Sequence, residues 1–141
     1  MIASMTGKID LIKQKFSSLK TPDERYALLI QMGRALPPFP SEQKTPANIV
    51  PGCQSTLYLC ATLVDNKLFF SAAADALISA GLAALLIEAF SGSTPEEILT
   101  SSPTFLQELG ITAALSPNRS NGLSSIYLRM KQIALKNIKT L

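Results

Sequence analysis

Five prolines lie between residues 36 and 51, at positions 37, 38, 40, 46 and 51, and they separate two parts of the chain with different patterns. Because proline lacks an amide hydrogen and clashes with the preceding helical turn, this segment is predicted to be a connection and not a long helix. Apolar residues before it recur at helical spacing, whereas residues after Cys53 alternate with a period of two. The order of helices, a small sheet and further helices predicts an α+β fold.

Two helix starts are marked by threonine–proline pairs. Thr21-Pro22 and Thr94-Pro95 each combine a capping threonine, a proline at the first helical position and a glutamate three residues after the cap. They predict helices from Thr21 to about Leu36 and over residues 95–99. Further helices are predicted at residues 9–16, with Ile9, Leu11, Ile12 and Phe16 facing inward, at 76–90 behind a capping Asp75, at 103–109, and at about 121–138. In the last helix, the predicted inner stripe is Leu123, Ile126, Tyr127, Met130, Ile133 and Ala134, and the predicted solvated residues are Arg129, Lys131, Lys136 and Lys139.

The segment with period two predicts a β-hairpin. Its two faces are Leu57, Leu59, Ala61 and Leu63 on one side, and Thr56, Tyr58, Cys60 and Thr62 on the other. Asp65-Asn66 supplies a turn, and residues 67–71 return as a second strand. A short strand at residues 48–50 would complete a small antiparallel sheet of about three strands, covered by the N-terminal and C-terminal helices.

Composition and charge limit the possible functions. The chain has 141 residues, of which 47% are hydrophobic, so we expect a single domain over residues 1–141 with its own core. The net charge of +3 is mild, and no basic run is interleaved with aromatic residues, so we expect no nucleic-acid partner. The apolar segment 76–87 is too short to span a bilayer, and the N-terminus lacks the apolar stretch of a secretion signal. We therefore expect a cytoplasmic protein with reduced thiols and no membrane association.

The residue with the clearest chemical potential is Cys53, which follows the turn-forming pair Pro51-Gly52 in a chain without histidine. The missing histidine removes the usual proton acceptor of a cysteine hydrolase and the commonest nitrogen ligand of a metal. Attack of a thiolate on another sulfur needs no such base. A lone cysteine is as often a small buried hydrophobic residue as a nucleophile, and reactivity requires a nearby cation or amide hydrogens that lower the thiol pKa.

The other candidate residues leave alternatives open. Cys60 is assigned to the core, because seven strand residues place it about 23 Å from Cys53 on the opposite face, which argues against a disulfide between the two. Two remote thiols without histidine also predict no metal site. Arg119, in a polar loop before the last helix, either is solvated or braces loop carbonyls, or else lies near Cys53 and favours the thiolate or binds a partner carboxylate. Asp75 is interpreted mainly as a helix cap, with a secondary role in recognition.

Several motifs resemble the SufE family (SufE and CsdE) of sulfur-acceptor proteins in iron–sulfur cluster assembly. They are Met32-Gly33-Arg34-Ala35-Leu36-Pro37, then Asn48 and Val50, Gly52-Cys53-Gln54-Ser55, Asp75-Ala76 with Ile78 and Gly81, and Leu115-Ser116-Pro117-Asn118-Arg119-Ser120-Asn121-Gly122-Leu123. Each motif alone is weak, but their order and spacing from about Tyr26 to Ala134 are specific. The resemblance implies a SufE/IscU-like fold.

The resemblance also implies a function. Cys53 would accept sulfane sulfur from a pyridoxal-phosphate-dependent cysteine desulfurase, stimulate that enzyme and pass the sulfur to a cluster scaffold, with no cofactor of its own. Gly52, Gln54 and Ser55 would shape the loop, and Asp75 and Arg119 would contact the partner. Two other functions remain open, a regulatory adaptor that activates the desulfurase by binding alone and a thiol oxidoreductase. The sequence leaves the oligomeric state open, with a homodimer among the possibilities.

Overall fold

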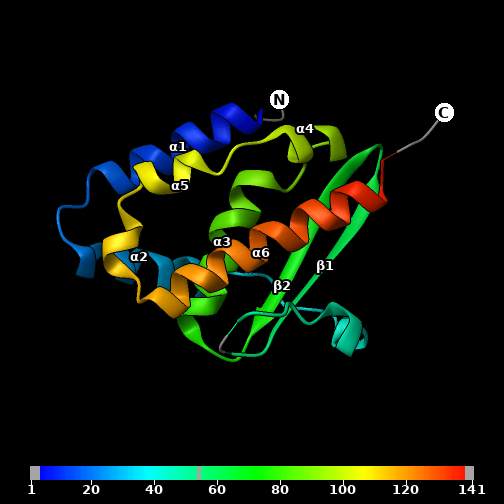
Figure 1. Ribbon diagram of the computed structural model, residues 1–141, viewed down its shortest axis with the longest axis horizontal. Helices are drawn as coiled ribbons and strands as arrows, with labels where there is room; N and C mark the ends of the chain where they lie inside the picture. The colour runs from blue at the N-terminus through cyan, green and yellow to red at the C-terminus, as the bar shows by residue number, and fades with distance from the viewer. Residues whose placement is uncertain (1–3, 54, 139–141) are drawn as a thin grey trace.

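The computed structural model describes residues 4–53 and 55–138, and it confirms the predicted α+β fold. Figure 1 shows a two-stranded hairpin with the α-helices to one side of it and the short 3-10 turns over residues 41–48 on the other. Helix α3 is central, because it contacts α1, α2, α6 and β2. The elements are α1 (Met5–Ser17), α2 (Pro22–Arg34), two 3-10 turns (Ser41–Gln43 and Pro46–Asn48), β1 (Leu57–Val64), β2 (Lys67–Ala74), α3 (Leu77–Phe90), α4 (Pro95–Thr100), α5 (Thr104–Glu108), a third 3-10 turn (Ile111–Ala114) and α6 (Pro117–Lys136).

The predicted helix caps are confirmed at α2 and α4. The Thr21 hydroxyl accepts from the Glu24 amide at 3.2 Å, and the Glu24 carboxylate accepts from the Thr21 amide at 3.2 Å. Thr94 and Glu97 form the same reciprocal capping box at the start of α4. In both helices a proline follows the cap, where the missing amide hydrogen costs no hydrogen bond.

The predicted hairpin is confirmed and is longer than expected. Strands β1 and β2 pair in register from Leu57 opposite Ala74 to Val64 opposite Lys67. Asp65 and Asn66 have φ of 51° and 62°, as a two-residue turn with both central residues in the left-handed region requires.

The prediction of about three strands is wrong, because the sheet within the described residues has two. In place of a third strand, Ile49 makes an isolated bridge to Tyr58. Pro46 sits in a 3-10 turn just before this bridge, and Pro51 begins a turn just after it. The segment between them is therefore too short to follow β1 further.

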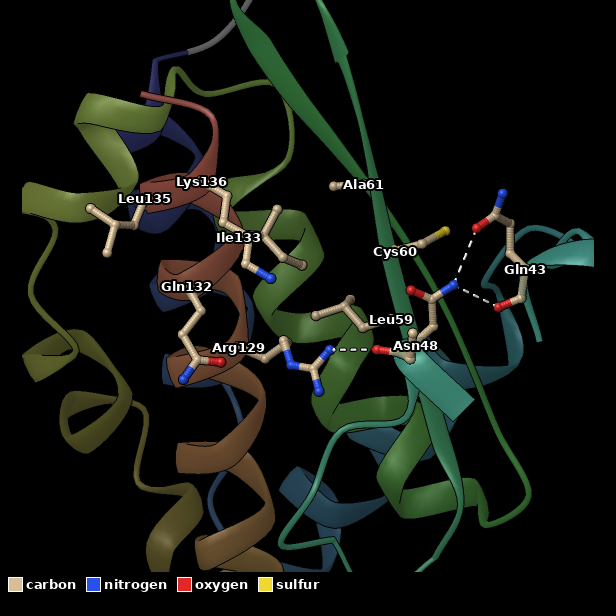
Figure 2. Close-up of a pocket in the computed structure, with 11 residues that line it drawn as sticks. Gln43, Asn48, Leu59, Cys60, Ala61, Arg129, Gln132, Ile133, Leu135 and Lys136 are labelled. Atoms are coloured by element: carbon tan, nitrogen blue, oxygen red, sulfur yellow. Dashed lines mark hydrogen bonds between the residues drawn. The ribbon is translucent and has the colours of Figure 1, made fainter. Parts of the chain in front are cut away.

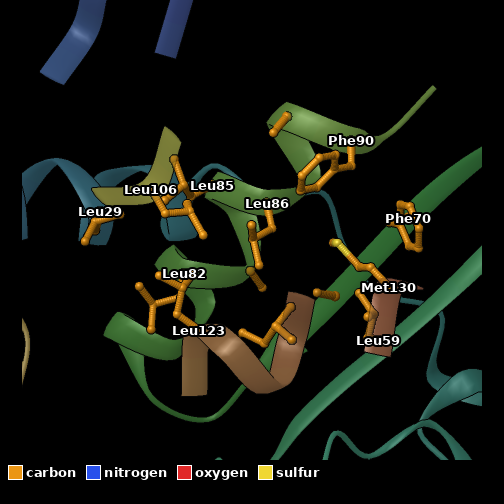
Figure 3. Close-up of a cluster of buried hydrophobic side chains, with 14 of the residues drawn as sticks. Leu29, Leu59, Phe70, Leu82, Leu85, Leu86, Phe90, Leu106, Leu123 and Met130 are labelled. Atoms are coloured by element: carbon orange, nitrogen blue, oxygen red, sulfur yellow. The ribbon is translucent and has the colours of Figure 1, made fainter. Parts of the chain in front are cut away.

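The core lies between α3 and the elements around it. Figure 3 shows side chains of α2, α3, α5 and α6 meeting those of the hairpin, among them Leu29, Leu59, Leu85, Leu106 and Met130. Helices α2 and α3 cross where Gly33 faces Gly81. A Cβ atom built on Gly33 would lie 2.5 Å from the Gly81 amide nitrogen, and one built on Gly81 would overlap the Leu29 carbonyl. The glycines therefore allow the two backbones to touch.

Three predicted helix starts are wrong. Helix α1 begins at Met5 behind the Ser4 cap, four residues before the predicted start at residue 9. Helix α3 begins at Leu77, and its N-cap is Ala76, so Asp75 lies outside the helix and does not cap it. Helix α6 begins at Pro117, because the Ser116 hydroxyl accepts from the Arg119 amide at 3.3 Å and starts the helix before residue 121. Arg119 is therefore in the first turn of α6 and not in a loop.

Three side chains also lie in surroundings that differ from those predicted. Leu11 is 53% exposed, because α1 turns only part of its apolar surface to the core. Arg129 is half-buried and donates to the carbonyls of Ala47 and Ile49 at 3.1 and 2.7 Å. Lys131 is also half-buried, over the Tyr127 ring at 5.1 Å. Arg129 and Lys131 therefore bind backbone carbonyls of neighbouring segments, Lys131 through the Ser101 carbonyl at 3.3 Å, and are not freely solvated.

A membrane-spanning segment would require a long apolar helix. None of the helices within residues 4–53 and 55–138 has the length and apolarity needed to cross a bilayer.

Candidate functional site

The Cys53 loop lies against α6. The Val50 amide donates to the Leu57 carbonyl at 2.9 Å, which fixes the start of the loop at the base of β1. Gly52 has φ of +86°, and a Cβ atom built on it would lie 2.5 Å from Ser125 Oγ. The positive φ therefore favours glycine here, and the short distance shows how closely the loop approaches α6, although rotation of the Ser125 side chain could relieve that contact.

The Cys53 thiol is half-buried between α3 and α6. Gly122 of α6 faces it, and a Cβ atom at Gly122 would lie 3.9 Å from the sulfur. A cavity of about 10 Å³ adjoins the thiol, with Leu82 of α3 and Ile126 of α6 among its lining residues. Since this volume is about that of one water molecule, the resting site is too small for another protein's side chain.

Arg119 is connected to the Cys53 loop by hydrogen bonds that involve the hydroxyl groups of Ser79 and Ser55. Its Nη1 donates to Ser79 Oγ at 3.0 Å, and Ser55 Oγ donates to the same oxygen at 2.6 Å. Ser79 is 4% exposed, and it lines the small cavity together with Cys53 and Arg119. The Ser79 hydroxyl therefore links three elements, namely the Cys53 loop, α3 and the first turn of α6.

Burial and charge act in opposite directions on the Cys53 thiol. Burial raises the pKa of Cys53, whereas the Arg119 guanidinium lowers this pKa by a smaller amount, so the net pKa is raised. The neutral thiol is therefore favoured while the loop is closed. Movement of the thiol into water would remove the larger effect and favour the thiolate.

The structure brings together four of the predicted site residues, Cys53, Gly52, Ser55 and Arg119. Gln54 lies outside the described residues. Asp75 is not part of this cluster: it is exposed, its amide donates to the Thr56 carbonyl at 3.2 Å, and it lines a separate hollow of about 330 Å³ with residues of the hairpin.

Sequence reasoning missed Ser79 and the role of Gly122 as the residue facing the thiol. Ser79 is a hydroxyl residue on the buried side of a largely apolar helix, where an unpaired polar group is costly. That placement was a usable signal that Ser79 has polar partners. The position of Gly122 against the sulfur depends on how α6 packs, which no local pattern indicates.

Cys60 was assigned to the core, and this prediction is wrong. The side chain is half-buried, its thiol is free, and burial raises its pKa. It points from β1 toward the side of Gln43 and lines a groove of about 750 Å³ (Figure 2). No cluster of three or more histidine, cysteine, aspartate or glutamate side chains with the geometry for a metal ion occurs among the described residues.

Comparison with solved structures gives a clear fold match. The solution structure of a hypothetical protein from Thermus thermophilus superimposes with a TM-score of 0.77, at 25% identity, covering 92% of this chain and 95% of that one. The arrangement of helices around a small sheet is therefore shared over nearly the whole length of both chains.

Sequence comparison identifies the family. The model of the SufE family, described as an Fe-S metabolism associated domain, matches residues 10–134. An uncharacterized SufE-like protein of Synechocystis is 35% identical over 94% of this chain and 84% of its own length. The sulfur acceptor protein CsdE of Escherichia coli is 34% identical over 86% of this chain and 84% of its own. SufE-like protein 1 of Arabidopsis thaliana, chloroplastic/mitochondrial, is 35% identical over 95% of this chain but only 36% of its own length.

The chain belongs to the SufE family, as its motifs predicted. This membership supports a role in iron–sulfur metabolism.

Proposed function

We propose that this protein, acting as a single domain over residues 1–141, is a persulfide carrier that uses Cys53 to accept sulfur from a cysteine desulfurase. The Cys53 thiolate attacks the outer sulfur of the persulfide on the donor cysteine. A new sulfur–sulfur bond forms at Cys53 while the bond in the donor breaks, and the donor thiolate leaves with the electron pair. The hydrogen stays on the transferred sulfur, so neither an oxidant nor a reductant is consumed.

The observation that carries this proposal is the position of the thiol, half-buried beside Arg119 on a loop with few attachments. No backbone hydrogen bond joins Pro51, Gly52 or Cys53 to another residue that the structure describes. A side-chain bond from Ser55 to Ser79 attaches the end of the loop. Such a loop can shelter the sulfur at rest and move outward when a partner docks.

Outward movement also explains how a thiol with a raised pKa becomes a nucleophile. Burial is the main cause of the raised pKa, so docking that draws Cys53 into a more polar site lowers the pKa and increases the thiolate fraction. The guanidinium of Arg119 then stabilises the thiolate or binds a carboxylate of the partner. Gly52, Gln54 and Ser55 shape the loop, and the exposed Asp75 contacts the partner from outside the thiol site.

The proposed partners are a pyridoxal-phosphate-dependent cysteine desulfurase as donor and a cluster scaffold as recipient. The description of the E. coli relative as a sulfur acceptor protein supports this direction of transfer. In delivery, a recipient thiolate attacks the outer sulfur on Cys53, and the Cys53 thiolate leaves. We also propose that removing sulfur from the desulfurase stimulates its turnover.

The test is to incubate the protein with a cysteine desulfurase and cysteine, and to measure the intact mass without reductant. We expect a gain of one sulfur atom that maps to Cys53. The gain should be absent in Cys53→Ser and retained in Cys60→Ser, which is the matched control because it removes the other thiol. No adduct with an active cognate desulfurase would refute the carrier function. If Cys53→Ser still stimulated the turnover of the desulfurase fully, the protein would instead be an adaptor that activates the enzyme by binding alone.

A further inference from the structure

The outer edge of strand β1 is open over part of its length. In an antiparallel pair, successive residues direct their backbone groups alternately toward the partner strand and away from it. The Leu57 carbonyl accepts from Val50, on the side away from β2, so Leu59, Ala61 and Leu63 also direct their backbone groups to that side. Beyond the bridge at Ile49, no backbone hydrogen bond to these outward groups of Ala61 or Leu63 occurs within residues 4–53 and 55–138.

The outer edge of β2, in contrast, is covered. The Leu68 amide donates to the Ser93 carbonyl at 2.8 Å, and the Gly92 amide donates to the Leu68 carbonyl at 2.7 Å. The Phe70 amide donates to Ser91 Oγ at 3.0 Å. The β2 edge is therefore covered over residues 68–70, which lie opposite the open stretch of β1 at Ala61 and Leu63.

A groove of about 750 Å³ runs beside the open edge. Its walls are β1, the C-terminal half of α6 and the segment around Asn48, as Figure 2 shows. Ile133 and Leu135 supply apolar surface on the α6 wall, and Leu135 is 65% exposed. An extended segment placed here would therefore find both backbone partners and apolar contacts.

The positive charge of the groove favours an extended segment with acidic side chains. Arg129 and Lys136 line it, and no carboxylate does among the described residues. Arg129 is fixed by its bonds to the Ala47 and Ile49 carbonyls, so its position does not depend on a ligand. A segment with acidic side chains would complement these cations.

We propose that this edge binds an acidic, extended segment of a partner protein, which adds to the sheet as a third strand antiparallel or parallel to β1. Backbone groups of Ala61 and Leu63 provide the hydrogen bonds, and alternate side chains of the segment lie against α6. A second copy of this chain fits less well. Pairing of β1 with its copy about a two-fold axis would bring α6 close to α6 of the copy, and residues 117–136 contain four cations, Arg119, Arg129, Lys131 and Lys136, and no carboxylate.

The test uses a capped heptapeptide of alternating glutamate and valine, titrated into the isotope-labelled protein and followed by amide NMR. We expect saturable shifts and slowed hydrogen exchange at the Ala61 and Leu63 amides. The same peptide with lysine in place of glutamate should bind about tenfold more weakly, because the charge complementarity is lost. Lys136→Glu should weaken the glutamate peptide and strengthen the lysine peptide.

Ala61→Pro tests the backbone contact directly. Proline is tolerated on an edge strand where its missing amide faces outward, so the bonds to β2 remain while the outward donor is removed. Ala61→Ser keeps the donor and is the matched control. Loss of peptide binding in Ala61→Pro alone supports the proposal. The absence of saturable shifts, equal binding of both peptides, or self-association that Ala61→Pro abolishes would overturn it, the last by assigning the edge to a second copy.

Discussion

Gly122 is the position at which one added methyl group tests the site of Cys53 most directly. The residue is buried in α6, and a Cβ atom there would lie 3.9 Å from the Cys53 sulfur, an ordinary van der Waals distance. Alanine in a helix interior is favoured over glycine by about 1 kcal/mol. Because no overlap offsets this gain, Gly122→Ala should raise the free energy of unfolding by about 0.5–1 kcal/mol, and the melting temperature by about 2–4 °C.

Gly81→Ala is the matched control, because it makes the same change in another buried helix. Here the new Cβ atom would overlap the Leu29 carbonyl, a backbone atom that no side-chain rotation can move away. The helices α2 and α3 must separate, which costs about 1–3 kcal/mol or more and exceeds the gain in helix propensity. We therefore expect opposite signs for the two variants in thermal unfolding followed by circular dichroism. A loss of stability in Gly122→Ala as large as in Gly81→Ala would refute the described packing around Cys53.

The same variant bears on the proposed carrier function. A persulfide adds a sulfur atom about 2 Å from the Cys53 sulfur, and the cavity beside the thiol is only about 10 Å³. The methyl group of Gly122→Ala narrows this cavity, so the added sulfur should no longer fit in it and should be more exposed to solvent. We expect Gly122→Ala to be loaded by the desulfurase and then to lose its sulfur to dithiothreitol faster than the wild type. An unchanged rate of loss would show that the persulfide does not occupy this position.

Further measurements test the site and the fold. The rate at which iodoacetamide alkylates Cys53 should keep increasing with pH until the pH exceeds the usual pKa of a thiol. The reason is that burial raises the pKa of Cys53 and the thiolate is the reactive form. Arg119→Gln should move the midpoint of this pH profile to higher pH, since the positive charge lowers the pKa; a shift to lower pH would contradict the role of the charge. Ser79→Ala should also move the midpoint to higher pH, but by less than Arg119→Gln, because it removes the hydroxyl that accepts from Arg119 Nη1. Ser79→Thr keeps a hydroxyl at this position and should restore the wild-type midpoint. Thr21→Ala and Thr94→Ala should each lower the free energy of unfolding by about 1 kcal/mol in urea titrations, and no change would mean that the capping boxes contribute nothing.

The parts of the fold that sequence reasoning predicted are those determined by neighbouring residues. A capping box is complete within four residues, so Thr21 with Glu24 indicates a helix start wherever the helix packs. The Asp65-Asn66 turn likewise determines the hairpin register through its own backbone angles. The turn at Pro51-Gly52 that precedes Cys53 was predictable for the same reason, since the residues that form it are adjacent in the chain.

The surroundings of the thiol depended on distant residues and were predicted only in part. Asp75 has the chemistry of a helix cap, but the backbone enters α3 one residue later, and Ala76 takes that position without a side-chain bond. Ser116 was interpreted as part of a loop, although its hydroxyl and the following proline start α6. Arg119 was named as a candidate, but its bond to Ser79 joins residues 40 positions apart, and no local pattern encodes that pairing.

The missing third strand and the open groove have the same physical cause. A segment that pairs along β1 needs an amide donor at every second residue. The Val50 amide donates to Leu57, so the next donors toward β1 would be residues 48 and 46, and Pro46 has no amide hydrogen. The pairing therefore stops at the bridge between Ile49 and Tyr58, and the backbone groups farther along β1 remain open. The prolines that separate helix from sheet in the sequence thus also determine where another chain can join the sheet. If Pro46 is the limiting residue, Pro46→Ala should extend the pairing beyond Ile49 and slow hydrogen exchange of the Ala61 amide, which lies opposite residue 46 in the register of the bridge. Unchanged exchange of this amide would show that the groove has another origin.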